Sequence, residues 1–404
     1  MPPLIFRRGL ELKSEVAGAL SNDYDSDIVK RLMASDYCLQ TGRLTLHLAR
    51  EFGFCYGVDR AVDYAYQTRK RFPDRPVYLT GEIIHNPHVN QKLRTAGVKF
   101  LSDQETHSQN LGSNDVVIIP AFGVTITELE HYVQRGCTLV DTTCGSVLNV
   151  WKNVNHYAKD RFTSVIHGKV HHEETRATAS QSLTHPGGQY LIVLNHDEVL
   201  EVCSYIRYGK GKKEFLKRFS VAASPGFDPD RDLKKIGLAN QTTMLMSESL
   251  QIGDMLRKAM LDRYGEAEID KHFRAFDTIC SATQDRQDAV KSLLKNYSLD
   301  LMVVAGGYNS SNTRNLARMA AERVPTYHIA DADALVSVTQ IRHRPIHPDG
   351  QKHLHKSNSE EMTTDAWLPN GPIVVGLTAG ASTPNNIVGQ IVDTIQKFTS
   401  IKEP

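Results

Sequence analysis

A recurring strand–turn–helix pattern is the feature of this sequence that most restricts its fold. From residue 43 onward, short runs rich in Val, Ile and Leu lead into turns of Gly, Ser, Asn and Thr, and amphipathic helical segments follow. Examples are RPVYLTGEIIHNPHVNQKLRTAG, LDLMVVAGGYNSSNTRNLARMAAERV and PIVVGLTAGASTPNNIVGQIVDTIQKF. Strands that alternate with helices in this way predict parallel sheets covered by helices, so we expect an α/β fold.

The length and an internal repeat predict three related α/β lobes. At 404 residues the chain is too long for one compact core. VDTTCGSVLNV and FDTICSATQDRQDAV both run Asp-Thr-X-Cys into a helical segment, and FGFCYGVDRAV shares with the second a Cys followed by Asp-Arg and Ala-Val. The expected divisions are an N-terminal extension (1–42), three lobes (43–143, 144–279 and 280–385) and a C-terminal helix (386–404), with an insertion at about 205–232 in the second lobe.

Charge and hydropathy exclude several classes of protein. The 47 basic and 46 acidic side chains give a net charge of +1, so we expect no nucleic-acid partner. No apolar stretch approaches the roughly 18 residues of a membrane span, and the N-terminus lacks the apolar region of a secretory signal. We therefore expect no membrane partner. Because no Ser- and Arg-rich transit peptide is evident, a bacterial cytoplasm is preferred to a plastid stroma, the alternative.

Three of the six cysteines stand where the thiolate form is favoured. Cys55, Cys144 and Cys280 each come at the turn into a predicted helix. There the helix dipole and the free N–H groups favour the thiolate, which is the form that binds metal. The other three are Cys38, Cys137 and Cys203. Free cysteines are commonly just buried, but the repeated Asp-Thr-X-Cys context favours a shared metal.

The cysteines alone do not determine which metal is bound. Zinc is possible, although the sequence has no paired CxxC spacing, and the contiguous cysteine run of an electron-transfer ferredoxin is absent too. Three thiolates on a four-iron cluster would leave one iron open to a substrate. A catalytic metal site needs such an open position, whereas a structural site is closed.

Polar residues follow the predicted strands at the edge where open α/β sheets bind ligands. They are His85, Asn86, His172, Glu173, Glu174, Thr242, Ser310, Ser311, Asn312 and Ser382. Each alone is explained as an ordinary helix cap, but together with helix N-termini they suit a phosphate group without Lys or Arg. Neither GxxxxGK[ST] nor a GxGxxG after a strand is present, so we expect no nucleotide cofactor.

Eight segments, in order from about residue 44 to residue 395, resemble the 4-hydroxy-3-methylbut-2-enyl diphosphate reductase family. They are FGFCYGVDRAV, GEIIHNPHVN, VDTTC, HGKVHHEET, ANQTTML, ICSATQDRQDAV, GYNSSNT and TAGASTP. The N-terminal extension, the insertion and the HEET form resemble the longer plant and cyanobacterial branch. The resemblance implies three α/β lobes around a central 4Fe–4S cluster, with Cys55, Cys144 and Cys280 as ligands and one iron open.

The resemblance also implies a reaction and the residues that serve it. Its diphosphate- and substrate-binding positions fall on His85, His172, Thr242, Ser310, Asn312 and Ser382, with Ser311 beside them. The substrate would lose its allylic hydroxyl to give isopentenyl and dimethylallyl diphosphate, the last step of the methylerythritol phosphate route. Glu174 falls on the carboxylate that delivers a proton, relayed through Thr242, and Glu173 is ranked below it. Phe122 departs from the pattern, since many shorter members have His in this turn.

Electron supply and two rival functions complete the expectations. No flavin or nicotinamide motif is present, so a ferredoxin- or flavodoxin-like protein would donate the electrons. A basic run at 210–218 could dock such a donor, although solvated loop charge is favoured. The alternatives are a redox-neutral iron–sulfur dehydratase, which needs no electron donor, and a non-enzymatic iron–sulfur sensor, which leaves the polar turns unexplained.

Overall fold

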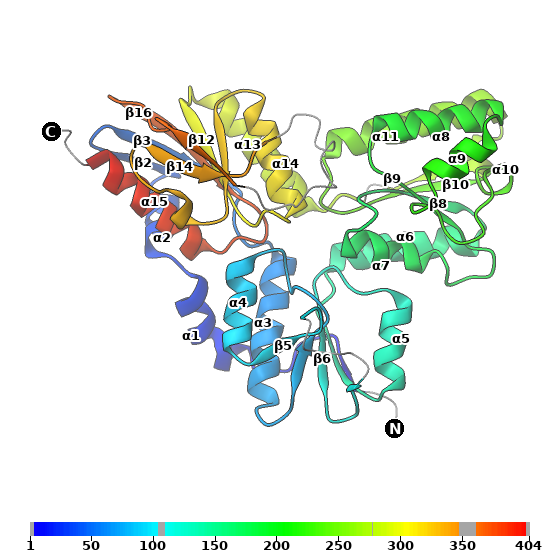
Figure 1. Cartoon of the computed structure of the whole chain (residues 1–404), viewed down its shortest axis with the longest axis horizontal. Helices are drawn as coiled ribbons and strands as arrows, with labels where there is room; N and C mark the ends of the chain where they lie inside the picture. Colours follow the sequence, from blue (N-terminus) through cyan, green and yellow to red (C-terminus); the bar gives the residue numbers. More distant parts are fainter. Residues whose placement is uncertain (1–3, 104–109, 277, 347–360, 401–404) are drawn as a thin grey trace. The chain divides into compact units, whose positions relative to one another are not determined.

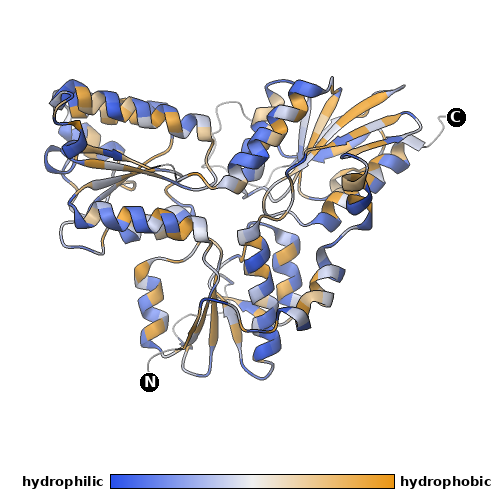
Figure 2. Cartoon of the chain, turned by 180° about the vertical axis from the view of Figure 1, so that it is seen from behind, coloured by the Kyte–Doolittle hydropathy of each residue, from blue (hydrophilic) through white to orange (hydrophobic). Residues whose placement is uncertain are grey.

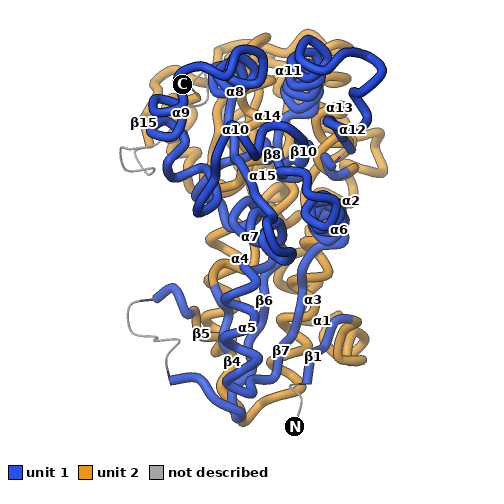
Figure 3. The backbone as a smooth tube through the Cα atoms, turned by 90° about the vertical axis from the view of Figure 1, so that its right-hand side faces the viewer, with its two compact units in different colours: residues 1–7, 78–80, 101–280 blue, residues 8–77, 81–100, 281–404 orange. Residues whose placement is uncertain are grey.

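The computed structural model describes residues 4–103, 110–276, 278–346 and 361–400, and it confirms the expected α/β fold with parallel sheets (Figure 1). The chain divides into two compact units (Figure 3). Unit 1 comprises Met1–Arg7, Tyr78–Thr80 and Leu101–Cys280. Unit 2 comprises Arg8–Val77, Gly81–Phe100 and Ser281–Pro404.

The first sheet of unit 1 is parallel and carries one of the turn cysteines after its strand β7. The sheet has five strands, and the four that lie in or reach unit 1 are, in spatial order, β1 (Ile5–Phe6), β7 (Thr138–Asp141), β6 (Val116–Ile119) and β4 (Val77–Leu79). All four residues of β6 are buried, as expected for a central parallel strand that is covered on both faces. Helix α5 (Ile126–Gln134) follows β6 and begins at a capping box of Thr125 and Glu128.

The second sheet of unit 1 is also parallel, and helices cover both of its faces. Its strands are, in order, β11 (Phe273–Ala275), β10 (Ile236–Asn240), β8 (Thr163–His167) and β9 (Tyr190–Val193). Its long helices are α6 (Gly145–Lys159), α7 (Glu173–Gln181), α8 (His196–Tyr208) and α11 (Met246–Tyr264), and the short α12 (Ile269–His272) precedes β11. Figure 1 shows α8 and α11 on one face and α6 and α7 on the other. The helices turn apolar residues toward the strands (Figure 2).

The predicted insertion contains two helices, α9 (Lys212–Arg218) and α10 (Pro229–Asp232). The favoured interpretation of the basic run as solvated loop charge is wrong for Lys212–Arg218, which is helical. Ion pairs stabilise this arrangement, since the Lys212 ammonium lies 2.6 Å from Asp228 and 2.9 Å from Asp230. Arg218 contacts Glu201 at 3.5 Å. Much of the basic charge is therefore matched within unit 1.

Unit 2 contains one large sheet, whose strands come from both ends of the chain. In order they are β13 (Thr326–Ile329), β12 (Leu301–Ala305), β16 (Ile373–Ala379), β3 (Leu44–Leu48) and the antiparallel edge strand β2 (Cys38–Thr41). A hairpin of β14 (Gln340–His343) and β15 (Met362–Asp365), the strand β5 (Val98–Phe100) and a 3-10 turn at Ala332–Ala334 complete the unit. Strand β3, which the sequence assigned to the first lobe, is parallel to β16. The lobe boundaries themselves stay predictions.

The helices of unit 2 include those of the N-terminal extension. They are α1 (Lys13–Tyr24), α2 (Asp27–Ala34), α3 (Tyr56–Arg71), α4 (Pro87–Thr95), α13 (Ser281–Asn296), α14 (Ser311–Ala321) and α15 (Asn385–Ser400). The side-chain carbonyl of Gln67 on α3 accepts N–H bonds from Leu10 and Leu12, and Asp23 accepts from Tyr66 and Lys92. The extension is therefore fixed to α3 and α4 by buried and half-buried polar contacts. None of the helices described combines the length and apolar character needed to cross a membrane.

The packing of β10 gives a test of the second sheet of unit 1. A Cβ at Gly237 would lie 2.6 Å from the Tyr157 ring, which is fully buried and held by a bond from its hydroxyl to the Leu238 carbonyl. Gly237→Ala should therefore lower the free energy of unfolding by about 1–3 kcal/mol in urea. Gly18→Ala, on the exposed part of α1 with no atom within 4 Å, should be neutral or stabilising. Equal stability of Gly237→Ala and the wild type would contradict this packing.

Candidate active site

The three turn cysteines lie at the starts of three helices. Cys55 is the N-cap of α3, Cys144 is the N-cap of α6, and Cys280 directly precedes α13. All three side chains are half-buried, and none forms a disulfide. A thiolate at each position faces the positive end of a helix dipole. The residues thus have the local environment that a metal-binding thiolate needs.

The remaining cysteines have different surroundings. Cys137 and Cys203 are buried, and burial raises the pKa of the Cys203 thiol to about 11. Cys38 lies on β2, where burial and the Asp36 carboxylate raise the pKa of its thiol. Helix α2 ends at Ala34, and from Cys38 the chain pairs with β3. The raised pKa values of Cys38 and Cys203 favour the neutral thiol over the thiolate.

A chain of hydrogen bonds in unit 1 joins a carboxyl group to a turn cysteine. One carboxyl oxygen of Glu174 accepts the backbone N–H of Thr242 at 2.6 Å, and the Thr242 carbonyl accepts the N–H of Cys280 at 3.3 Å. His172, the N-cap of α7, accepts the N–H of Glu174 at its Nδ1, at 3.2 Å. We call His172, Glu174, Thr242 and Cys280 the carboxyl cluster. Thr242 connects its members through its main chain.

The amide side chain of Gln241 connects the segments that carry the carboxyl cluster. Its carbonyl oxygen accepts the N–H of Lys169 at 3.2 Å and the hydroxyl of Thr175 at 3.1 Å, and its amide donates to Thr243 at 2.8 Å. Gln241 is buried. It therefore ties the turn after β8 and the first turn of α7 to the turn after β10, so that Glu174 and Thr242 stay in register.

Burial separates the two adjacent glutamates. Glu174 is 3% exposed, whereas the side chain of Glu173 is 53% exposed. A buried carboxyl group without partners would be unfavourable, and the Thr242 N–H supplies one. The ranking of Glu174 above Glu173 as proton donor stays a prediction.

A second group of polar turns meets within unit 2. Asn312 accepts the N–H of Ala381 at 3.0 Å, and the Ser382 hydroxyl donates to the His85 carbonyl at 3.2 Å. The N-cap of α14 is Ser310, which accepts the N–H of Thr313 at 3.2 Å, and Ser311 is the first residue of that helix. We call His85, Ser310, Ser311, Asn312 and Ser382 the polar-turn cluster. The N–H of Cys55 joins it by donating to the Ala381 carbonyl at 3.1 Å.

The polar-turn cluster contains a donor group without a protein acceptor. The Nδ2 atom of Asn312 is buried and finds no hydrogen-bond partner among the residues that the structure describes. The His85 imidazole Nδ1 lies 2.7 Å from the Glu82 carboxylate, with the side chain only 10% exposed. A buried amide donor at the start of a helix is suited to an anionic oxygen.

Two glycines let the turns of this cluster approach one another. A Cβ at Gly307 would lie 2.3 Å from the His85 carbonyl oxygen. Gly306 has a φ of +144°, and a Cβ there would lie 2.5 Å from the Thr383 hydroxyl. Only glycine fits between the turn after β12 and its neighbours, so the GGYNSSN segment requires both residues.

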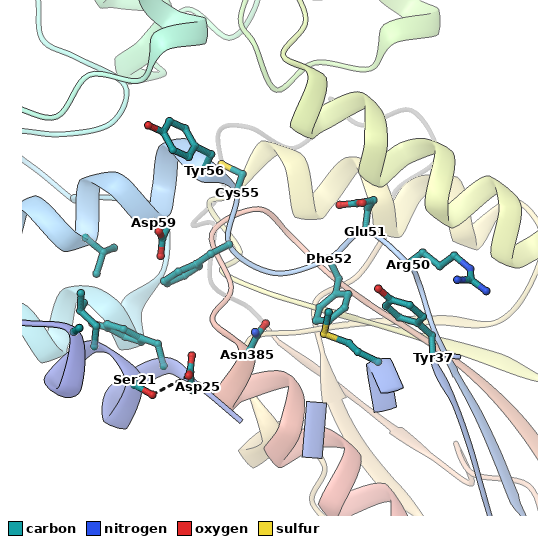
Figure 4. A pocket seen from close by; sticks show the side chains of 16 residues that line it. Ser21, Asp25, Tyr37, Arg50, Glu51, Phe52, Cys55, Tyr56, Asp59 and Asn385 are labelled. Atoms are coloured by element: carbon teal, nitrogen blue, oxygen red, sulfur yellow. Dashed lines mark hydrogen bonds between the residues drawn. The ribbon is translucent and has the colours of Figure 1, made fainter. Parts of the chain in front are cut away.

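The sequence did not reveal a cavity of about 660 Å³ beside Cys55 in unit 2 (Figure 4). Its lining includes residues of the N-terminal extension, and Ser21 there donates to Asp25 at 2.8 Å. Figure 4 shows Cys55 next to Tyr56, which is 82% exposed. No short motif marks such a cavity, because its walls include residues of α1, α2, α3 and α15 and of the segment before α3.

Comparison with known proteins gives a family match over most of the chain. The family described as "LytB protein" matches residues 46–396. A 4-hydroxy-3-methylbut-2-enyl diphosphate reductase from Trichormus variabilis is 46% identical over 392 residues, covering 96% of this chain and 93% of the relative. The reductase from Microcystis aeruginosa is 46% identical over 401 residues, covering 98% of this chain and 96% of the relative.

Two solved structures with the same fold are described as diphosphate reductases. The structure of an (E)-4-hydroxy-3-methyl-but-2-enyl diphosphate reductase, the terminal enzyme of the non-mevalonate pathway, matches with a TM-score of 0.51 and 26% identity, covering 87% of this chain and 99% of that one. The reductase structure from Plasmodium falciparum matches with a TM-score of 0.60 and 23% identity, covering 87% and 88%, which shows a shared fold.

Proposed function

The chain belongs to the LytB family of 4-hydroxy-3-methylbut-2-enyl diphosphate reductases, and from that premise we propose that Cys55, Cys144 and Cys280 hold one 4Fe–4S cluster with an open iron. The protein is a reductase of the terminal step of the non-mevalonate pathway. Membership in a reductase family contradicts the dehydratase and sensor alternatives. The positions of the three cysteines at helix starts support the ligand assignment, because the N–H groups of a helix start can donate to a metal-bound sulfur.

The reaction needs protons and electrons in equal number. Breaking the allylic C–O bond and releasing water consumes two electrons and two protons, and the products are isopentenyl and dimethylallyl diphosphate. The cluster, when bound, supplies a Lewis-acidic iron for the substrate hydroxyl and a path for the electrons. The protein's own residues must then hold the diphosphate and place a proton beside the departing oxygen.

Glu174 is the proposed proton donor, and the single observation that carries this is its bond to Thr242. The carboxyl group is buried, with one oxygen held by the Thr242 N–H, and the next bond in the chain reaches Cys280. An acid beside a proposed cluster ligand is where a departing hydroxyl needs a proton. The Thr242 side chain is assigned to relay that proton to the substrate oxygen.

We assign the diphosphate to neutral side chains that can donate hydrogen bonds, and no Lys or Arg is among them. They are His85, His172, Ser310, Ser311, Asn312 and Ser382. The Asn312 amide supports this assignment, since its Nδ2 has no acceptor among the described residues and a phosphate oxygen would provide one. Holding the phosphate end orients the carbon end of the substrate.

Electrons would come from a separate ferredoxin- or flavodoxin-like protein, and we place the reaction in a bacterial cytoplasm. The sequence has no flavin or nicotinamide motif to hold a reductant of its own. The similarity to reductases from cyanobacteria supports the bacterial setting.

Substrate affinity tests the assignment of the polar-turn cluster. Asn312→Ala should raise KM for the allylic diphosphate by about 10- to 100-fold, because it removes a bond to a charged group. Lys213→Glu with Lys217→Glu, on helix α9, is the matched control and should leave KM unchanged. Lys212 is avoided because its ion pairs anchor the insertion. If the helix variant lost affinity and Asn312→Ala retained it, the diphosphate site would be assigned wrongly.

Turnover tests the role of Glu174. Glu174→Gln keeps the shape of the side chain but cannot release a proton, so it should lower turnover on the order of 10²–10⁴-fold while cluster content and KM stay near normal. Glu173→Gln, the exposed neighbour, should change turnover far less. The measurement is the anaerobic steady-state rate with a reduced viologen dye. A fully active Glu174→Gln enzyme would remove this residue from the mechanism.

A further inference from the structure

The Phe122 ring contacts the imidazole of His172 within unit 1. The ring centroids lie 6.1 Å apart and the planes meet at 80°, which is the edge-to-face geometry that aromatic pairs favour. His172 belongs to the carboxyl cluster, and Phe122 lies in the turn after β6. The contact therefore joins a turn without a polar side chain of its own to a residue assigned to the diphosphate.

The turn that carries Phe122 is held on both sides. The Ala121 carbonyl accepts the N–H of Cys144 at 2.9 Å, and the Pro120 carbonyl accepts the N–H of Gly123 at 2.9 Å. Gly123 has a φ of +75°, and a Cβ there would lie 2.4 Å from the Trp151 ring. These contacts restrain the main chain on both sides of Phe122.

The same tryptophan connects the turn to the helix that His172 caps. The indole N–H of Trp151 donates to the Thr178 hydroxyl on α7 at 3.2 Å. The Phe122 turn and the middle of α7 thus both contact Trp151 of α6. Movement of one relative to the other would break this contact.

The His172 ring has a defined tautomer in this arrangement. Its Nδ1 accepts the N–H of Glu174, so in the neutral imidazole the proton is on Nε2. Its side chain is only 8% exposed. A ring flip would break the bond at Nδ1, and the edge contact with Phe122 opposes rotation of the ring out of its plane.

We propose that Phe122 is a positioning residue, whose ring holds His172 in the orientation that caps α7 at Nδ1 and offers Nε2–H to the diphosphate. The inference rests on the proposed function, because that function assigns His172 to the diphosphate. It predicts that an aromatic ring at position 122 matters for affinity and hardly at all for the chemical step.

Affinity for inorganic diphosphate, measured by anaerobic calorimetry on the cluster-loaded enzyme, provides a readout apart from turnover. Phe122→Leu should raise Kd for inorganic diphosphate and KM for the substrate by about 3- to 10-fold, the value of an aromatic pair, with kcat nearly unchanged. Phe122→Tyr keeps the ring and should restore both values. Phe122→Met provides a second ringless variant should Phe122→Leu lose its cluster.

A double-mutant cycle decides whether the effect passes through His172. His172→Ala should weaken diphosphate binding, and adding Phe122→Leu to it should cause no further loss. The control is Tyr132→Leu, which removes an edge contact of similar geometry to His131, at 5.7 Å and 76°, and should leave Kd unchanged.

Three results would overturn the inference. They are an unchanged Kd in both ringless variants, an equal further loss on the His172→Ala background, and wild-type affinity in His172→Ala itself. Failure of the proposed function is recognised separately, because the wild-type enzyme would then neither bind inorganic diphosphate nor show turnover that depends on the reductant.

Discussion

One backbone contact recurs at all three turn cysteines, and the arrangement of the candidate site depends on it. The N–H of Cys55 donates to the Ala381 carbonyl, that of Cys144 to the Ala121 carbonyl, and that of Cys280 to the Thr242 carbonyl. Each acceptor lies in a turn that follows a strand of a parallel sheet. Because parallel strands bring their carboxyl ends to one edge, each cysteine is tied to a turn at the edge where open α/β sheets bind ligands. The hydrogen bond is shared by Cys144 and Cys280, which follow Asp-Thr-X, and by Cys55, which does not.

Through this contact, a polar side chain and a cysteine that lie on different segments are connected by hydrogen bonds to the same residue. Asn312 bonds to the N–H of Ala381, whose carbonyl holds Cys55, and Glu174 bonds to the N–H of Thr242, whose carbonyl holds Cys280. In both cases the backbone of one residue, Ala381 or Thr242, lies between a cysteine and a polar side chain, with its N–H bonded to the side chain and its carbonyl to the cysteine N–H.

Local sequence patterns predict the helix starts and the polar turns of the candidate site, but they do not predict which distant segments pair. Helix starts at Cys55 and Cys144 and the polar turns after strands follow from periodicity and capping residues, which act within a few positions. The pairing of β3 with β16 joins segments more than 300 residues apart, which no local pattern specifies. The helix at Lys212–Arg218 depends on ion pairs to Asp228 and Asp230, and the Phe122 contact with His172 depends on two separate turns.

The central claim is that three specific thiolates hold the cluster, and the iron and sulfide content of anaerobically purified variants tests it most directly. Wild type and Cys38→Ser should each contain iron and sulfide in the proportions of one 4Fe–4S cluster per chain. Cys55→Ser, Cys144→Ser and Cys280→Ser should each lose most of both, since a serine hydroxyl is a poor substitute for thiolate. A full cluster in Cys144→Ser, with the wild-type absorbance, would contradict the account.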